Sequence, residues 1–237
     1  MTRRRFIADE IEGNHAALTG DHAGHLARVL RARVGQEFDI ATPSAVRHGC
    51  ITSVSDQRVE FELGGEVTAS QTTPVTLFLA IFKFDRMEWA LEKCTELGAS
   101  RMVPVIAQRT ESHLATAASK RQQRWVRLTR QASEQSRRAV PPELGPPARL
   151  KDILEGHAPG IVLSEIETQV MLRDAIPPAS ASLTLAIGPE GGWTAPELEL
   201  FQTRGWTPAS LGPTILRAET AAIAALAVAL SQLSGQE

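Results

Sequence analysis

The stretch Ile187-Gly188-Pro189-Glu190-Gly191-Gly192-Trp193 follows a short apolar run and precedes a helix-forming segment. A second turn of the same kind, Leu211-Gly212-Pro213, follows later in the chain. Glycines lack a Cβ atom, so backbone N–H and C=O groups can approach a ligand closely, and prolines fix φ so that a turn is shaped in advance. One such turn is often only a strand-to-helix connection. The pair of turns predicts a cofactor pocket that is recognised mainly by backbone groups.

The position of the first turn within the predicted elements supports this interpretation. Ile187 ends an apolar run that reads as a buried strand, and ligands of open parallel sheets bind beyond the carboxyl ends of the strands. The turn has no Gly-Lys-Ser/Thr ending and no Gly-x-Gly-x-x-Gly pattern, so the motifs of nucleoside triphosphate and dinucleotide binding are absent from it.

Short apolar runs alternate with helical periodicity from residue 73 to the C-terminus. This alternation predicts an α/β fold with a mainly parallel sheet covered on both faces. The expected strands are Val75 to Ile81, Met102 to Ala107, Ile161 to Leu163 and Leu183 to Ile187. The expected helices are one capped by Asp85 and Glu88 and ending at Gly98, Ser119 to Arg138, one with a Thr194 and Glu197 capping box that runs to Gly205, and Ala218 to Leu233.

The N-terminal part of the chain has a different pattern. Residues 1–70 read as short strands separated by turns, which predicts a small β-barrel. A polar, threonine-rich segment from Glu66 to Pro74 reads as a linker. We therefore predict two domains, residues 1–70 and 73–237.

The composition is that of an ordinary globular protein, with 43% hydrophobic and 22% charged residues. No apolar run is long enough for a membrane span and the N-terminus lacks a signal-peptide pattern, so we expect a cytoplasmic protein with no membrane partner. Cys50 and Cys94 match no metal or redox spacing. His22 and His25 could share a helical face, but no further ligand completes a site, and we expect no metal.

The net charge of −2 hides local clusters of basic residues. Any one cluster could be a solvated surface, but three clusters together favour an RNA partner. The candidate RNA-binding residues are Arg3, Arg4 and Arg5 at the N-terminus, Arg28 and Arg31, and Arg121, Arg124, Arg127, Arg137 and Arg138 on or beside one predicted helix.

The two turns and several internal segments resemble one known family. Ile187 to Trp193 and Leu211 to Ala221 look like the SPOUT-superfamily RNA methyltransferases, within which the chain most resembles the family that methylates N3 of a uridine in small-subunit ribosomal RNA. The segments Arg4 to Phe6, His25 to Arg31, Glu92 to Gly98 and Glu134 to Arg137 fit the same resemblance. It implies an N-terminal PUA-like β-barrel that binds RNA, a C-terminal trefoil knot, S-adenosylmethionine as cofactor, a decoding-region uridine of 16S ribosomal RNA as target, and a homodimer.

The resemblance also implies a set of site residues. Methyl transfer to uracil N3 removes a weakly acidic proton, so a base or a cation near the pocket would help, and the catalytic candidates are Glu190, Arg217 and Glu219. Each glutamate could instead be an ordinary helix-start residue. The expected cofactor-binding residues are Leu163, Ile187, Gly188, Pro189, Glu190, Gly191, Gly192, Leu211, Gly212, Ile215 and Leu216.

Two alternatives stay open at this point. The protein could be a non-catalytic RNA-binding or ribosome-assembly protein whose α/β domain only dimerises, or a SPOUT methyltransferase that acts on transfer RNA. The alanine and leucine stripes of the last predicted helix fit either burial within one subunit or contact with a second.

Overall fold

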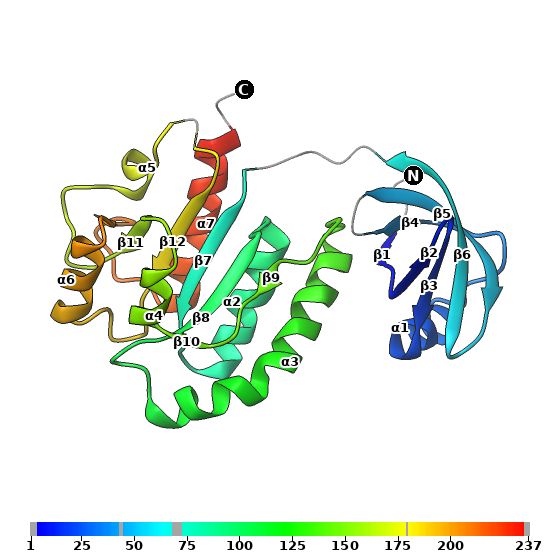
Figure 1. Ribbon diagram of the computed structural model, residues 1–237, viewed down its shortest axis with the longest axis horizontal. Helices are drawn as coiled ribbons and strands as arrows, with labels where there is room; N and C mark the ends of the chain where they lie inside the picture. The colour runs from blue at the N-terminus through cyan, green and yellow to red at the C-terminus, as the bar shows by residue number, and fades with distance from the viewer. Residues whose placement is uncertain (1–3, 43–44, 68–72, 179, 235–237) are drawn as a thin grey trace. The chain divides into compact units, whose positions relative to one another are not determined.

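A computed structural model describes residues 4–42, 45–67, 73–178 and 180–234 (Figure 1). The chain divides into two compact units. The first comprises residues 1–71 together with 133–141, and the second comprises residues 72–132 together with 142–237. Sequence patterns had not indicated that 133–141 belongs with the N-terminal unit.

The second unit is built on a seven-stranded sheet in which every strand pairing is parallel. The strand order is β10-β8-β7-β12-β11-β13, with β9 also paired to β8. The predicted α/β class with a parallel sheet is therefore confirmed. The strands are β7 (Val75–Ala80), β8 (Arg101–Ile106), β9 (Glu143–Leu144), β10 (Ala148–Arg149), β11 (Ile161–Leu163), β12 (Leu183–Ile187) and β13 (Thr207–Ala209).

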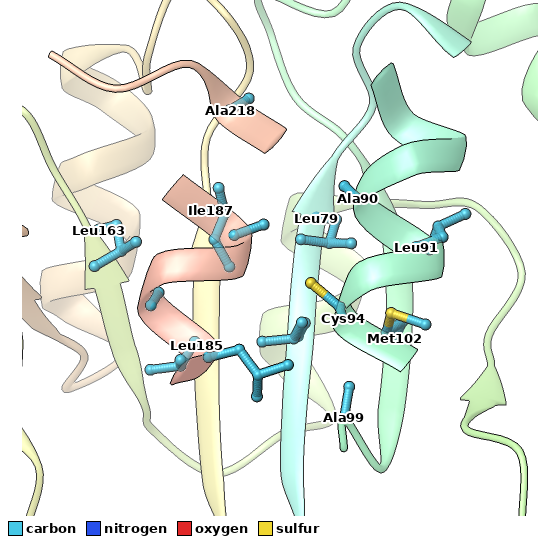
Figure 2. Packing of buried hydrophobic residues seen from close by; sticks show 14 of the residues in the cluster. Leu79, Ala90, Leu91, Cys94, Ala99, Met102, Leu163, Leu185, Ile187 and Ala218 are labelled. Atoms are coloured by element: carbon cyan, nitrogen blue, oxygen red, sulfur yellow. The ribbon is translucent and has the colours of Figure 1, made fainter. Parts of the chain in front are cut away.

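Helices cover both faces of this sheet. Successive residues of a strand point to opposite faces, so each strand contributes side chains to two hydrophobic clusters. Leu77 and Leu79 of β7 pack in one hydrophobic cluster with α2, α3 and α7, and Phe78 and Ala80 pack in the other with α4 and α6. Figure 2 shows residues of the first cluster, with Ala90 and Cys94 on the side of α2 next to Leu79 of β7. The helices are α2 (Phe84–Leu97), α3 (Ser112–Gln135), α4 (Leu150–Glu155), α5 (Leu172–Ala175), α6 (Ala195–Thr203) and α7 (Ala218–Ser234).

Helix α7 buries its small-residue stripe inside the unit. Ala222, Ala225 and Ala229 are fully buried, and α7 contacts α2, β7 and β12. The stripe is therefore covered within one chain, and its burial does not require a second subunit. No helix in the described ranges combines the length and the apolar character that a membrane crossing needs.

The first unit holds a six-stranded sheet in the order β1-β4-β5-β6-β3-β2. Strands β1 and β2 stand at its two ends, and no pairing between them closes the sheet in the described part of the chain. The curled sheet is thus open, and the predicted barrel is not confirmed. Its elements are β1 (Arg5–Ile7), β2 (Glu10–Glu12), β3 (His15–Thr19), α1 (Gly20–Gly24), the π-helical turn η1 (His25–Val29), β4 (Glu37–Ala41), β5 (Val46–Val54) and β6 (Arg58–Val67).

Two local predictions for the second unit were wrong. Helix α2 begins at Phe84 after Lys83, without a side-chain cap, so Asp85 and Glu88 do not form a capping box. Glu88 instead accepts hydrogen bonds from two arginines of α3. Helix α3 also starts seven residues before the predicted Ser119, because Ser112 to Ala118 continue its helical pattern. By contrast, the Thr194 and Glu197 capping box is confirmed.

Candidate cofactor pocket

A cavity of about 370 Å³ lies at the carboxyl ends of three neighbouring parallel strands. Leu163 ends β11 and Ile187 ends β12, Ser164 and Gly188 follow them, and the residues after β13 close the third side. Loops and turns converge at such an edge, which makes it the usual ligand site of parallel sheets. Both glycine turns line this cavity, so the structure brings together the two segments that the sequence singled out.

The first turn, Gly188 to Gly192, is shaped by its glycines. Gly192 has φ of +71°, and its N–H donates to the Pro189 carbonyl at 2.8 Å. A Cβ atom at Gly192 would lie 2.8 Å from Glu165 Oε1, and one at Gly188 would lie 3.2 Å from Trp193 Nε1. Larger residues at these two positions would therefore push side chains apart at the pocket wall.

The second turn has the same dependence on glycine. Gly212 has φ of +132°, and its N–H donates to the Ser210 hydroxyl at 3.1 Å. The following residues run along the cavity, and the Ile215 side chain is 83% exposed. An exposed apolar side chain beside a pocket is an available contact for an apolar or aromatic ligand surface.

The loop after β8 supports the first turn from outside. The buried Glu197 carboxylate accepts a hydrogen bond from Gln108 N–H at 2.8 Å, and the Thr194 hydroxyl donates to the Gln108 side chain at 3.0 Å. Arg109 donates to the carbonyl of Gly191 and also lines the cavity. Backbone and side-chain hydrogen bonds thus fix the turn in place, which reduces the ordering cost of binding a ligand.

A chain of three charged residues stands at the same place. Arg86 Nη1 donates to Glu190 Oε1 at 2.9 Å, and Arg86 Nε lies 3.7 Å from Glu219 Oε1. The Glu190 side chain is 35% exposed and lines the cavity, whereas that of Glu219 is 4% exposed. Glu219 Oε2 is buried without a hydrogen-bond partner among the described residues.

Comparison with known proteins identifies the family. The model of a family described as "RNA methyltransferase domain" matches residues 69–230, more than half of the chain. The chain belongs to this RNA methyltransferase family. The resemblance to RNA methyltransferases that the sequence suggested is confirmed.

Relatives of this methyltransferase support the same assignment along nearly its whole length. The ribosomal RNA small subunit methyltransferase E of Mycobacterium bovis is 33% identical over 95% of this chain and 90% of its own length. A structure of ribosomal RNA small subunit methyltransferase E from Neisseria gonorrhoeae, bound to S-adenosylmethionine, is 28% identical, with a TM-score of 0.84 over 95% of both chains. A Legionella pneumophila protein that holds bound S-adenosylmethionine is 26% identical, with a TM-score of 0.86 over 98% of both chains.

The predicted site residues of the methyltransferase fall into two groups. Every predicted cofactor-binding residue except Gly191 lines the cavity, and so does the catalytic candidate Glu190. Gly191 lies outside the lining, and a Cβ atom there would face Arg109 Cδ at 3.2 Å. Arg217 and Glu219 are not among the lining residues either, since Arg217 is exposed and Glu219 is buried at the start of α7.

Sequence reasoning missed several residues of the methyltransferase pocket. Ser164 and Glu165 follow β11 directly, and the rule that ligands bind beyond strand ends would have found them. Arg109 lies in the loop after β8 and lines the cavity. Arg86 stands in the first turn of α2 and reaches the site through its ion pair with Glu190. Only the folded sheet brings these two residues to the glycine turns.

Two of the predicted RNA-binding arginines on α3 are already paired. Arg124 holds Glu88 through two hydrogen bonds of 2.8 Å, and Arg121 Nη1 lies 3.3 Å from the same carboxylate. Arg127 is exposed, and within the described residues its hydrogen bond goes to the Gln123 carbonyl of its own helix. The charge that α3 offers a polyanion is therefore smaller than its arginine count suggests.

The candidates in the first unit also differ from one another. Arg5 packs against Asp39 at 3.4 Å and donates to the Arg137 carbonyl, so its side chain stabilises the unit. Arg138 is partly buried, and this burial lowers the pKa of its guanidinium. Arg4, Arg28, Arg31 and Arg137 are exposed, whereas Arg3 lies outside the described residues.

Proposed function

We propose that this chain is an S-adenosylmethionine-dependent methyltransferase that modifies N3 of a uridine in the decoding region of 16S ribosomal RNA. The observation that carries the proposal is the cavity formed by two glycine turns at the carboxyl ends of β11, β12 and β13. The family match and the relatives named as small-subunit ribosomal RNA methyltransferases support the reaction and the RNA class.

The residues of the cavity fit the chemistry of S-adenosylmethionine. Leu163, Ile187 and Leu211 supply apolar contacts for an adenine ring, and the backbone of the glycine turns supplies hydrogen-bonding groups for its edge. The carboxylates of Glu165 and Glu190 line the same cavity and favour a cationic ligand. The bound cofactor supplies an electrophilic methyl group on a sulfonium, and the C–S electron pair leaves with sulfur when the methyl group is transferred.

Glu190 is the candidate best placed to take the N3 proton. Its carboxylate lines the cavity and is partly exposed, whereas both the burial of Glu219 and the position of Arg217 outside the lining argue against direct roles for those two. In the proposed step the N3 proton moves to Glu190, the N3 lone pair forms the bond to the methyl carbon, and Glu190 afterwards releases the proton to water. Since N3 lies on the Watson–Crick edge, the target base must be unpaired or turned out of its stack.

Two further features belong to the proposal. We expect the segment from Ser210 to Arg217 to complete a trefoil knot, because it leads from the edge strand β13 back to α7, which packs on the inner strands β7 and β12. We also expect a homodimer, as is typical of SPOUT enzymes, and the solution mass from light scattering tests it.

The test is methyl transfer from isotopically labelled S-adenosylmethionine to small ribosomal subunits that lack the modification, with transfer RNA as a parallel substrate. The proposal predicts label in 16S ribosomal RNA and saturable cofactor binding by calorimetry. Label in transfer RNA alone would favour the alternative substrate. RNA affinity without cofactor binding or label would favour a non-catalytic assembly protein.

A further inference from the structure

Arg86 joins the two segments that the sequence marked as the site. It follows β7 and stands in the first turn of α2, yet it pairs with Glu190 of the first glycine turn and with Glu219 at the start of α7. These partners lie 104 and 133 positions away in the sequence. The guanidinium therefore lies where the starts of α2 and α7 meet the first glycine turn.

Exposure changes in one direction along this chain of charges. Glu219 is 4% exposed, Arg86 is 32% exposed and Glu190 is 35% exposed and lines the cavity. The inner carboxylate cannot reach a ligand, since its Oε2 atom is covered by protein and Oε1 faces Arg86. Burying a carboxylate costs free energy unless it is paired with a cation. The ion pair therefore stabilises the buried Glu219 and at the same time holds the Arg86 side chain in place.

Glu190 forms the outer end of this row of charges, and the position of its carboxylate matters for the proposed proton transfer. The Glu190 side chain is 35% exposed, and the hydrogen bond of 2.9 Å from Arg86 holds its carboxylate. A proton acceptor must be held within hydrogen-bond reach of the proton that it removes. Fixed placement by neighbouring groups is what gives such an acceptor its efficiency.

We propose that Arg86 is a positioning residue of the methyl-transfer site, which holds the Glu190 carboxylate at the cavity and is itself held by the buried Glu219. The inference rests on the proposed function and adds two residues to it. It also gives Glu219 an indirect role in place of that of a base.

The experiment is a double-mutant cycle in single-turnover methyl transfer, with Arg86→Gln, Glu190→Gln and the double variant at saturating cofactor and RNA. Arg86→Gln is expected to lower the rate about 10²-fold while leaving cofactor affinity within about twofold. In the Glu190→Gln background the same change is expected to have no further effect, because Arg86 acts through Glu190. Arg86→Lys keeps the charge and is expected to recover part of the rate.

Lys93→Gln is the matched control, because Lys93 lies on the same helix and also pairs with two carboxylates, Glu92 at 2.7 Å and Glu96 at 2.8 Å. It should leave the rate unchanged. Thermal unfolding of every variant separates loss of fold from loss of rate, and Arg86→Lys replaces any Arg86→Gln protein that does not fold.

Chemical rescue separates the two glutamates. Formate should restore activity to Glu190→Ala, whose site opens to the cavity, and should not restore it to Glu219→Ala. The inference would be overturned if Arg86→Gln lowered the methyl-transfer rate equally in the unaltered protein and in Glu190→Gln. It would also be overturned if Arg86→Gln lowered only the cofactor affinity. Absence of methyl transfer by the unaltered protein would instead overturn the proposed function, and that result is seen before any variant is compared.

Discussion

Gly192 shows how far the local geometry of a single position can be predicted from sequence. Its place in the Gly188 to Gly192 turn predicts close approach of backbone to a ligand, and the structure gives it φ of +71° at the cavity wall. Gly191 belongs to the same turn and carries the same prediction, but it lies outside the lining. Which of two adjacent glycines faces a cavity depends on dihedral angles that the sequence pattern does not specify.

Gly192→Ala is expected to weaken S-adenosylmethionine binding about tenfold or more and to destabilise the fold by about 1 kcal/mol. The added Cβ would lie 2.8 Å from Glu165, and alanine is strained at positive φ. Calorimetry and denaturant unfolding measure the two effects. Gly156→Ala is the control, because nothing lies within 4 Å of its Cβ position and its φ is −104°; equal cofactor affinities for the two variants would contradict the prediction.

Cys94 gives a prediction about pH. Burial against the sheet raises the pKa of its thiol from 9.0 to about 12. The unfolded chain releases this proton at lower pH than the folded one, so the contribution of the neutral thiol to stability is present below pH 9 and is lost as the pH rises toward 12. We expect the free energy of unfolding to fall by about 1 kcal/mol more between pH 8 and pH 10 in the unaltered protein than in Cys94→Ala. Parallel pH dependences of the two proteins would show that the thiol does not titrate in this way.

Helix α3 illustrates the limit of reading function from an element. Its outward arginines and inward Trp125 follow from helical periodicity, and Trp125 is fully buried as that pattern predicts. The same periodicity cannot reveal that Glu88 of α2 neutralises part of the charge, since the two helices meet only in the folded unit. The capping box assigned to Glu88 was wrong for the same reason, because a competing tertiary ion pair was available.

We expect the triple change Arg121→Gln, Arg124→Gln and Arg127→Gln to weaken RNA binding and to reduce the slope of log affinity against log salt by about 2, with cofactor affinity unchanged. This reduction is smaller than the one expected for the loss of three unpaired cations, because Glu88 already offsets one of the charges. Glu88→Gln is expected to have the opposite effect and to strengthen RNA binding, because it removes the negative charge that offsets the arginines. Filter-binding titrations over a salt series measure both, and an unchanged slope in the triple variant would make this face a solvated surface only.

The two units differ in how much of them the sequence predicts. In the α/β unit, four strands and the last helix were placed within one or two residues, because buried parallel strands and amphipathic helices have strong periodicity. Short elements such as β9, β10 and α5 were missed, since two to four residues carry no measurable period. The three-residue strand β11 was found because all of its residues are apolar. In the N-terminal unit the strands were expected but their closure into a barrel was not confirmed, because closure depends on pairing between the two ends of the sheet rather than on any local pattern.

The cavity's lining was predictable for the segments adjacent to the glycine turns, and the charged residues around it were not. Glu190 is part of the motif itself, whereas Arg86 and Arg109 reach the site through the crossover connections of the sheet. Such contacts follow from the strand order β8-β7-β12-β11, which the alternation of strands and helices leaves open.

The most direct measurement is mass spectrometry of nuclease-digested 16S ribosomal RNA after small subunits that lack the modification have been incubated with this protein and S-adenosylmethionine that carries a deuterated methyl group. We predict one labelled nucleoside, N3-methyluridine, in a fragment from the decoding region, and loss of the label with Glu190→Gln. Label on another atom or another base, or no label in the presence of saturating cofactor, would contradict it.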